Sequence, residues 1–168
     1  GAGKTSRSVK ESAAALGLEY LDQLLIHWPG QFVRRGEGDN DATNAALRRE
    51  TWHELEGLLA AGLVRSIGVS NFSERHLREL LSFAKTPPAV NQIEVHPYNQ
   101  RGSLVELCQK HGIIVNSYCP LGGKGNKGQV TDVLLKDPVI NAIGAAHGKT
   151  AAQAILRWHL QRGLTPIP

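Results

Sequence analysis

Short apolar runs alternate with amphipathic stretches along most of this sequence. Leu77, Leu80, Leu81 and Ala84 follow the i, i+3, i+4, i+7 spacing of a helix that covers a core with one face. Similar spacings predict helices over residues 1–22, 51–61, 104–111 and 133–135, and a last one that starts at a capping box of Thr150 and Gln153. Apolar runs predict strands at residues 24–26, 66–69, 90–95, 113–118 and 164–168. The alternation predicts an α/β fold in which helices cover a parallel sheet.

Three further segments stand outside this alternation. Residues 29–49 are rich in Gly, Asp, Asn and Arg, and we expect a long loop of the kind that often carries function. Residues 122–128 form a glycine-rich loop, in which the basic stretch from Lys124 to Lys127 suits a phosphate-bearing small molecule. Residues 139–143 are an apolar segment that we assign to neither helix nor strand.

Chemically versatile side chains gather at the carboxyl ends of the predicted strands. The ends read His27-Trp28, Ser70-Asn71, Gln92 with Glu94 and His96, and Tyr118-Cys119. A closed parallel barrel brings such ends together at one mouth, where these folds hold their active sites. An open dinucleotide-binding sheet would instead show a glycine-rich turn after its first strand, and none follows residues 24–26. The pattern therefore favours a barrel over an open sheet.

Composition and charge narrow the function classes. The 19 basic residues are scattered among 15 acidic ones, so the net charge of +4 does not indicate a nucleic-acid partner. No run of apolar residues is long enough to predict a membrane span. Two cysteines are too few for a disulfide framework, and the start of the chain does not read as a secretion signal. We therefore expect a cytoplasmic protein.

Five stretches, in this order, resemble the aldo-keto reductase family. They are LDQLLIHWP at residues 21–29, GLVRSIGVSNF at 62–72, NQIEVHP at 91–97, NSYCPLG at 116–122 and GKTAAQAILRW at 148–158, with Pro166 to Pro168 after them. The resemblance implies that residues 1–168 are a partial (β/α)8 TIM barrel with five of its eight parallel strands and their helices. The chain would run from the third barrel helix to the eighth strand, without the three N-terminal strands and the C-terminal helix and loop.

The same resemblance implies an enzyme that reduces aldehydes or ketones to alcohols with NADPH. His27 resembles the histidine that donates a hydrogen bond to the substrate carbonyl oxygen, and Trp28 resembles a wall of the substrate pocket. The family's tyrosine proton donor, with its lysine and aspartate partners, would lie before Gly1. We therefore expect residues 1–168 alone to be inactive. Which carbonyl compound is the substrate, and which oligomeric state the protein adopts, are left open.

The cofactor side of the implied site follows the next strands. Ser70, Asn71 and Gln92 resemble the groups that hold the nicotinamide carboxamide, which needs both hydrogen-bond donors and acceptors. Tyr118 resembles the tyrosine that stacks on the nicotinamide ring. Cys119 and Leu121 lie where the family wraps the pyrophosphate, and the family often has a serine at the position of Cys119.

Features of the sequence suggest three alternative functions. His27, Glu94 and His96 would suit a metal-dependent barrel hydrolase, but no paired histidine motif supports this alternative. We therefore assign no metal to the protein. Glu94 and His96 are expected to have structural roles at the barrel rim. Residues 1–5 resemble the end of a phosphate-binding loop that lacks its first glycine and its strand. A non-catalytic, truncated product that binds a nucleotide or a partner is the third alternative.

Overall fold

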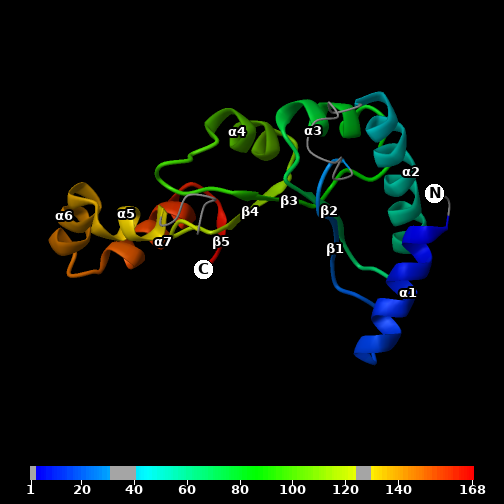
Figure 1. Ribbon diagram of the computed structural model, residues 1–168, viewed down its shortest axis with the longest axis horizontal. Helices are drawn as coiled ribbons and strands as arrows, with labels where there is room; N and C mark the ends of the chain where they lie inside the picture. The colour runs from blue at the N-terminus through cyan, green and yellow to red at the C-terminus, as the bar shows by residue number, and fades with distance from the viewer. Residues whose placement is uncertain (1–2, 31–40, 124–129) are drawn as a thin grey trace. The chain divides into compact units, whose positions relative to one another are not determined.

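Five strands in one sheet and seven helices make up the part of the chain that the computed structural model describes, residues 3–30, 41–123 and 130–168 (Figure 1). The helices are α1 (Lys4–Leu16), α2 (Asp41–Ala60), α3 (Glu74–Leu81), α4 (Gly102–Lys110), α5 (Val130–Lys136), α6 (Pro138–Ala146) and α7 (Ala151–Gln161). The strands are β1 (Leu24–Ile26), β2 (Ile67–Ser70), β3 (Val90–Glu94), β4 (Ile114–Tyr118) and β5 (Thr165–Ile167), and they are neighbours in chain order. The five predicted strands are confirmed. The chain divides into two compact parts, residues 1–91 and 92–168, which are described separately below.

Three expectations about helices were wrong. Helix α1 ends at Leu16 instead of residue 22, because Gly17 caps it in the left-handed conformation with a φ of 68°. Helix α2 begins at Asp41, ten residues before the predicted start, so much of the expected loop 29–49 is helical. Alanine and leucine favour a helix there, and the polar Asn44 and Arg48 are buried on one face of it rather than solvated in a loop. Residues 138–146 form α6, whose start was overlooked: Asp137 accepts the Ile140 amide at 2.9 Å, and Pro138 occupies the first helical turn. The basic stretch Lys124–Lys127 lies outside the described residues.

The core of the first part lies between β2 and its helices. Every residue of β2 is buried, as expected for a strand with neighbours on both sides. Gly68 is required by this packing, because a Cβ atom there would lie 2.8 Å from both the Leu25 side chain and the Val90 carbonyl oxygen. Large buried side chains from α2 and α3 cover the strand, among them Trp52, Leu55, Leu77 and Leu80.

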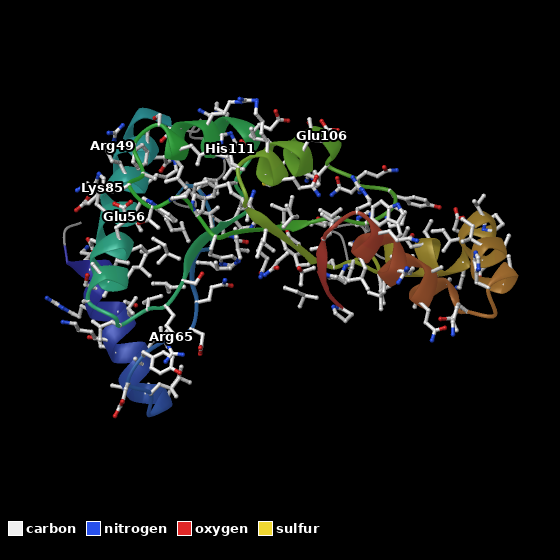
Figure 2. All side chains as sticks on the ribbon, turned by 180° about the vertical axis from the view of Figure 1, so that it is seen from behind. Arg49, Glu56, Arg65, Lys85, Glu106 and His111 are labelled. Atoms are coloured by element: carbon white, nitrogen blue, oxygen red, sulfur yellow. The ribbon has the colours of Figure 1, made fainter. Side chains whose placement is uncertain are left out.

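Helix α2 is fixed to the segment before β3 by polar contacts. The Trp52 indole N–H donates to the Thr86 carbonyl oxygen at 3.2 Å. The Glu56 carboxylate accepts the backbone N–H groups of Lys85 and Thr86 at 2.7 and 2.8 Å, and Figure 2 shows Glu56 and Lys85 close together. Burial alone raises the pKa of Glu56, but hydrogen bonds from the Thr86 amide, His53 and the Lys85 amide lower it below the ordinary value. Glu56 therefore stabilises this loop as a carboxylate.

The second part is built around α4, β4, α7 and β5. Buried Leu104, Leu107 and Cys108 of α4 lie with Val115 of β4 in its core, and β4 pairs in parallel with β5. The predicted capping box of α7 is confirmed by the reciprocal bonds of Thr150 and Gln153, at 3.0 and 3.2 Å. No helix in the described ranges is both long and apolar enough to cross a membrane.

Replacing Glu56 with alanine is expected to lower the free energy of unfolding by about 1–3 kcal/mol, because two backbone N–H groups lose a charged acceptor. The wild-type advantage should be full above the ordinary carboxyl pKa of 4.5 and should fade as the pH falls through the lower folded value. Denaturant unfolding of both proteins from neutral to acidic pH measures this difference. Glu106→Ala, at an exposed position of α4 (Figure 2), is the matched control, and equal losses in the two variants would contradict the role of Glu56.

Candidate functional site

The parallel register of β1 and β2 brings two predicted site segments together. Ile26 is the register partner of Val69, so His27 and Ser70 follow the last paired residues of their strands. Ser70 is buried, with 3% of its surface exposed, whereas His27 is exposed. The end of β2 thus supplies a fixed hydroxyl group, and the end of β1 supplies an accessible imidazole.

Asn71 connects these two strand ends directly. Its side-chain amide donates to the His27 carbonyl oxygen at 3.0 Å and to the Ser70 hydroxyl oxygen at 3.1 Å. The backbone of Asn71 has a φ of 61°, in the left-handed region that asparagine tolerates better than most residues. This conformation turns the chain sharply after β2. Such backbone strain is often found where function requires it.

Trp28 stands beside His27 and is open to solvent. The two ring centroids are 5.7 Å apart at an interplanar angle of 44°, and 42% of the Trp28 surface is exposed. An exposed indole next to an exposed imidazole offers an apolar wall and a hydrogen-bonding group side by side. The arrangement suits a small molecule with one polar group on an apolar body.

Asn91 supports the turn after β2 from inside the first part. It is fully buried, and its side-chain amide donates to the Phe72 carbonyl oxygen at 3.0 Å. The turn that follows Ser70 and Asn71 is therefore fixed by a hydrogen bond from β3. Asn91 belongs to the NQIEVHP motif but is not among the predicted site residues, because a sequence does not show which amides become buried.

The predicted site residues of the second part lie on β3, at the end of β4 and in the turn beyond it. Gln92 is a half-buried residue of β3. Tyr118 is the last residue of β4, also half-buried, and burial raises the pKa of its phenol, to which the neighbouring Glu94 carboxylate adds. Tyr118 is therefore a neutral aromatic ring at physiological pH.

Cys119 and Leu121 form the tight turn after β4. The Gly122 amide donates to the Cys119 carbonyl oxygen at 2.9 Å, and Cys119 has a φ of 48°. A Cβ atom on Gly123 would lie 2.8 Å from the Cys119 sulfur, so only glycine fits against the thiol without displacement. Although Cys119 is exposed as a residue, partial burial and then Glu94 raise the pKa of its thiol. Like Asn71, Cys119 combines a strand end with left-handed backbone.

Glu94 and His96 make local contacts at the end of β3. The His96 Nε2 atom lies 3.4 Å from a Glu94 carboxylate oxygen, and His96 is 4% exposed. Burial lowers the pKa of His96, and the nearby carboxylate opposes this shift only in part. Among residues 3–30, 41–123 and 130–168, no three His, Cys, Asp or Glu side chains are grouped as a metal site would require.

Comparison with known proteins places the chain in a family. The sequence profile of the aldo/keto reductase family matches residues 2–168. The chain belongs to the aldo/keto reductase family. It is 42% identical to aldo-keto reductase family 1 member A1 of Rattus norvegicus over 96% of this chain and 52% of that protein. It is 43% identical to aldose reductase B of Dictyostelium discoideum, over 91% of this chain and 51% of that protein.

Solved aldo-keto reductases also share the fold. A crystal structure of a Gox0644 mutant in complex with NADPH has a TM-score of 0.81 and 40% identity, and it covers all of this chain and 55% of that one. An aldo-keto reductase from a Medee basin deep-sea metagenome library, MGS-M4, has a TM-score of 0.82 at 35% identity. The chain thus spans about half the length of the relatives it matches. The prediction of five strands of a (β/α)8 barrel is confirmed, and NADPH is the cofactor of the family.

Proposed function

We propose that residues 1–168 are part of an NADPH-dependent reductase that converts aldehydes or ketones to alcohols. The observation that carries the proposal is the coupled pair of strand ends, in which Asn71 connects the His27 segment to Ser70, in a chain of the aldo/keto reductase family. An exposed imidazole beside an exposed indole suits a carbonyl compound with an apolar body. Trp28 is expected to contribute to the choice of substrate within this class.

The side chains present fit a nicotinamide carboxamide. By residue type, the hydroxyl of Ser70 and the amides of Asn71 and Gln92 supply the hydrogen-bond donors and acceptors that a primary amide requires. Ser70 is buried and oriented by the Asn71 amide, so little freedom is lost when it binds. The ring of Tyr118 remains neutral, which suits stacking against the cofactor. Cys119 and Leu121 would approach the pyrophosphate with the backbone of their turn.

Chemical roles follow from these positions. The bound dinucleotide supplies the hydride, and the carboxamide contacts decide which ring face points to the substrate. His27 donates a hydrogen bond to the carbonyl oxygen and stabilises the negative charge that develops there. Trp28 confines the apolar body of the substrate beside the imidazole. The group that protonates the oxygen lies outside residues 1–168 in this proposal, and residues 1–168 alone do not turn over substrate.

A nucleotide-binding function without catalysis is the alternative to the reductase. A non-catalytic protein that only binds nucleotide would use the same Ser70, Asn71, Gln92 and Tyr118 contacts, and it differs from the reductase by the absence of turnover. The cytoplasmic location, the absence of a nucleic-acid partner and the structural roles of Glu94 and His96 stay predictions.

The complete protein that carries residues 1–168 is expected to oxidise NADPH in the presence of aldehydes, and more slowly with ketones. NADPH is expected to support faster turnover than NADH at equal concentration. Loss of nicotinamide absorbance across a panel of aromatic and aliphatic carbonyl compounds is the measurement, with the cofactor alone as the blank. A protein that binds NADPH but oxidises none of it across the panel would establish the non-catalytic alternative instead.

Replacing His27 with alanine in the complete protein is expected to lower kcat on the order of 100- to 1,000-fold, because one hydrogen bond to the developing oxyanion is lost. The Kd for NADPH should remain within about twofold, since His27 faces substrate rather than cofactor. Steady-state kinetics and cofactor titration measure the two effects. His111→Ala, at an exposed position after α4 (Figure 2), is the control. A loss of cofactor affinity as large as the loss of turnover would show that His27 contributes to cofactor binding, contrary to the role proposed here.

A further inference from the structure

A buried arginine lies behind the segment that carries His27 and Trp28. Arg48 of α2 has only 5% of its surface exposed. Its Nε atom donates to a Glu79 carboxylate oxygen at 3.1 Å, and its Nη2 atom donates to the other oxygen of the same carboxylate. The remaining nitrogen, Nη1, donates to the Pro29 carbonyl oxygen at 2.9 Å. One guanidinium therefore connects α2, α3 and the residue that follows Trp28.

The ion pair explains only part of this arrangement. A buried charge is costly unless it is paired and hydrogen-bonded, and the two bonds to Glu79 pair the buried guanidinium with a carboxylate. Those two bonds connect α2 to α3 and do not involve the segment that follows β1. The third bond satisfies a further N–H group of the buried guanidinium, and it is directed to a loop carbonyl rather than to a second acidic side chain. It requires the planar fork of arginine, because a lysine ammonium cannot donate in parallel to a carboxylate and also reach a third group at this spacing.

The third bond completes a set of contacts along four consecutive residues. Asn71 holds the His27 carbonyl oxygen at 3.0 Å, and Arg48 holds the Pro29 carbonyl oxygen at 2.9 Å. Gly30 packs so closely on Asn44 that an added Cβ atom would lie 2.9 Å from the Asn44 side-chain nitrogen. The segment is thus fixed before and after Trp28, while the His27 and Trp28 side chains stay exposed.

A small cavity confirms that Arg48 and Trp28 share one environment. Its volume is about 180 Å³, and its lining includes Trp28, Pro29, Gly30, Asn44 and Arg48. Side chains of α2 therefore line the same cavity as the indole. A shift of Arg48 would change this shared cavity and would reach His27 through the backbone from Pro29.

We propose that Arg48 is a positioning residue for carbonyl reduction, which holds the Pro29 carbonyl so that His27 and Trp28 meet the substrate in a fixed geometry. The inference rests on the proposed reductase function. It assigns to Arg48 no contact with substrate or cofactor. Its effect is therefore expected on the use of the carbonyl substrate and not on the binding of NADPH.

The test is Arg48→Lys in the complete protein, which keeps the positive charge and removes the fork. Arg78→Lys is the matched control, because Arg78 makes an exposed i, i+4 pair with Glu74 on the neighbouring helix, with N···O at 3.9 Å. Arg48→Lys is expected to lower kcat/KM for an aldehyde by about 10- to 100-fold, as small displacements of a reacting group do. The Kd for NADPH should stay within about twofold, and Arg78→Lys should match the wild type in both. A purely structural role would lower the melting temperature and leave kcat/KM per folded molecule unchanged, and that result would overturn the proposal.

A second variant covers the case in which Arg48→Lys fails to fold. In Gly30→Ala the added Cβ atom would lie 2.9 Å from the Asn44 side-chain nitrogen and 3.1 Å from its Cγ atom. Because Asn44 is itself buried, we expect the segment after Trp28 to shift while the buried ion pair is left unchanged. Gly30→Ala is expected to lower kcat/KM in the same direction, again with unchanged NADPH affinity. Wild-type kinetics for a folded Arg48→Lys, or for Gly30→Ala where Arg48→Lys does not fold, would refute the assignment.

A protein that oxidises no NADPH would refute the proposed function but not yet the positioning by Arg48. In that case the imidazole resonances of His27 decide, recorded with labelled histidine and identified from the His27→Ala spectrum. They are expected to shift in Arg48→Lys and to stay in place in Arg78→Lys. Unshifted His27 resonances in Arg48→Lys would show that the arginine does not position this segment.

Discussion

Parallel pairing of β1 with β2 is the constraint on which the site in the first part depends. The register that matches Ile26 with Val69 brings the His27 and Ser70 positions to the same end of neighbouring strands. It holds only because Gly68 leaves room for the Leu25 side chain and the Val90 carbonyl, where any Cβ atom would collide. A slip of one residue would turn every side chain of β2 to the other face. The amide of Asn71 then joins the two ends by a direct bond to the His27 carbonyl.

Strained backbone marks strand ends in both parts of the chain. Asn71 and Cys119 each follow a strand, and each adopts positive φ although neither is glycine. In the first part the strain aims an amide at the neighbouring strand end. In the second part it begins a tight turn in which Gly123 packs on the Cys119 sulfur. In each case the left-handed residue places polar groups just beyond the end of an apolar strand. Parallel α/β folds have their active sites at these strand ends.

Much of the fold could be predicted from the sequence because strands and helix caps leave local signals. Apolar runs located all five strands, and Thr150 with Gln153 marked the start of α7. The start of α2 was missed because Asn44 and Arg48 read as solvated loop residues, whereas distant partners such as Glu79 and Pro29 make them a buried helix face. The start of α6 was missed although Asp137 and Pro138 carry a cap signal.

The candidate site could likewise be predicted only in part from the sequence. Motifs at strand ends indicated His27, Ser70, Asn71 and Tyr118, because their residue types are distinctive and follow apolar runs. Arg48 and Asn91 could not be found in this way. Their importance comes from burial and from hydrogen bonds to backbone carbonyls far along the chain, at Pro29 and Phe72. Left-handed backbone at Asn71 and Cys119 is likewise visible only in the structure.

The most direct test of the account is whether the end of β2 holds the cofactor. Ser70→Ala in the complete protein removes one buried hydroxyl at the carboxyl end of β2, and Ser66→Ala removes a hydroxyl just before the other end of the strand. Titration with NADPH is predicted to show an affinity weakened by about three- to tenfold for Ser70→Ala, the value of one hydrogen bond, and unchanged for Ser66→Ala. Equal affinity of wild type and Ser70→Ala would contradict the assignment of this strand end to the nicotinamide.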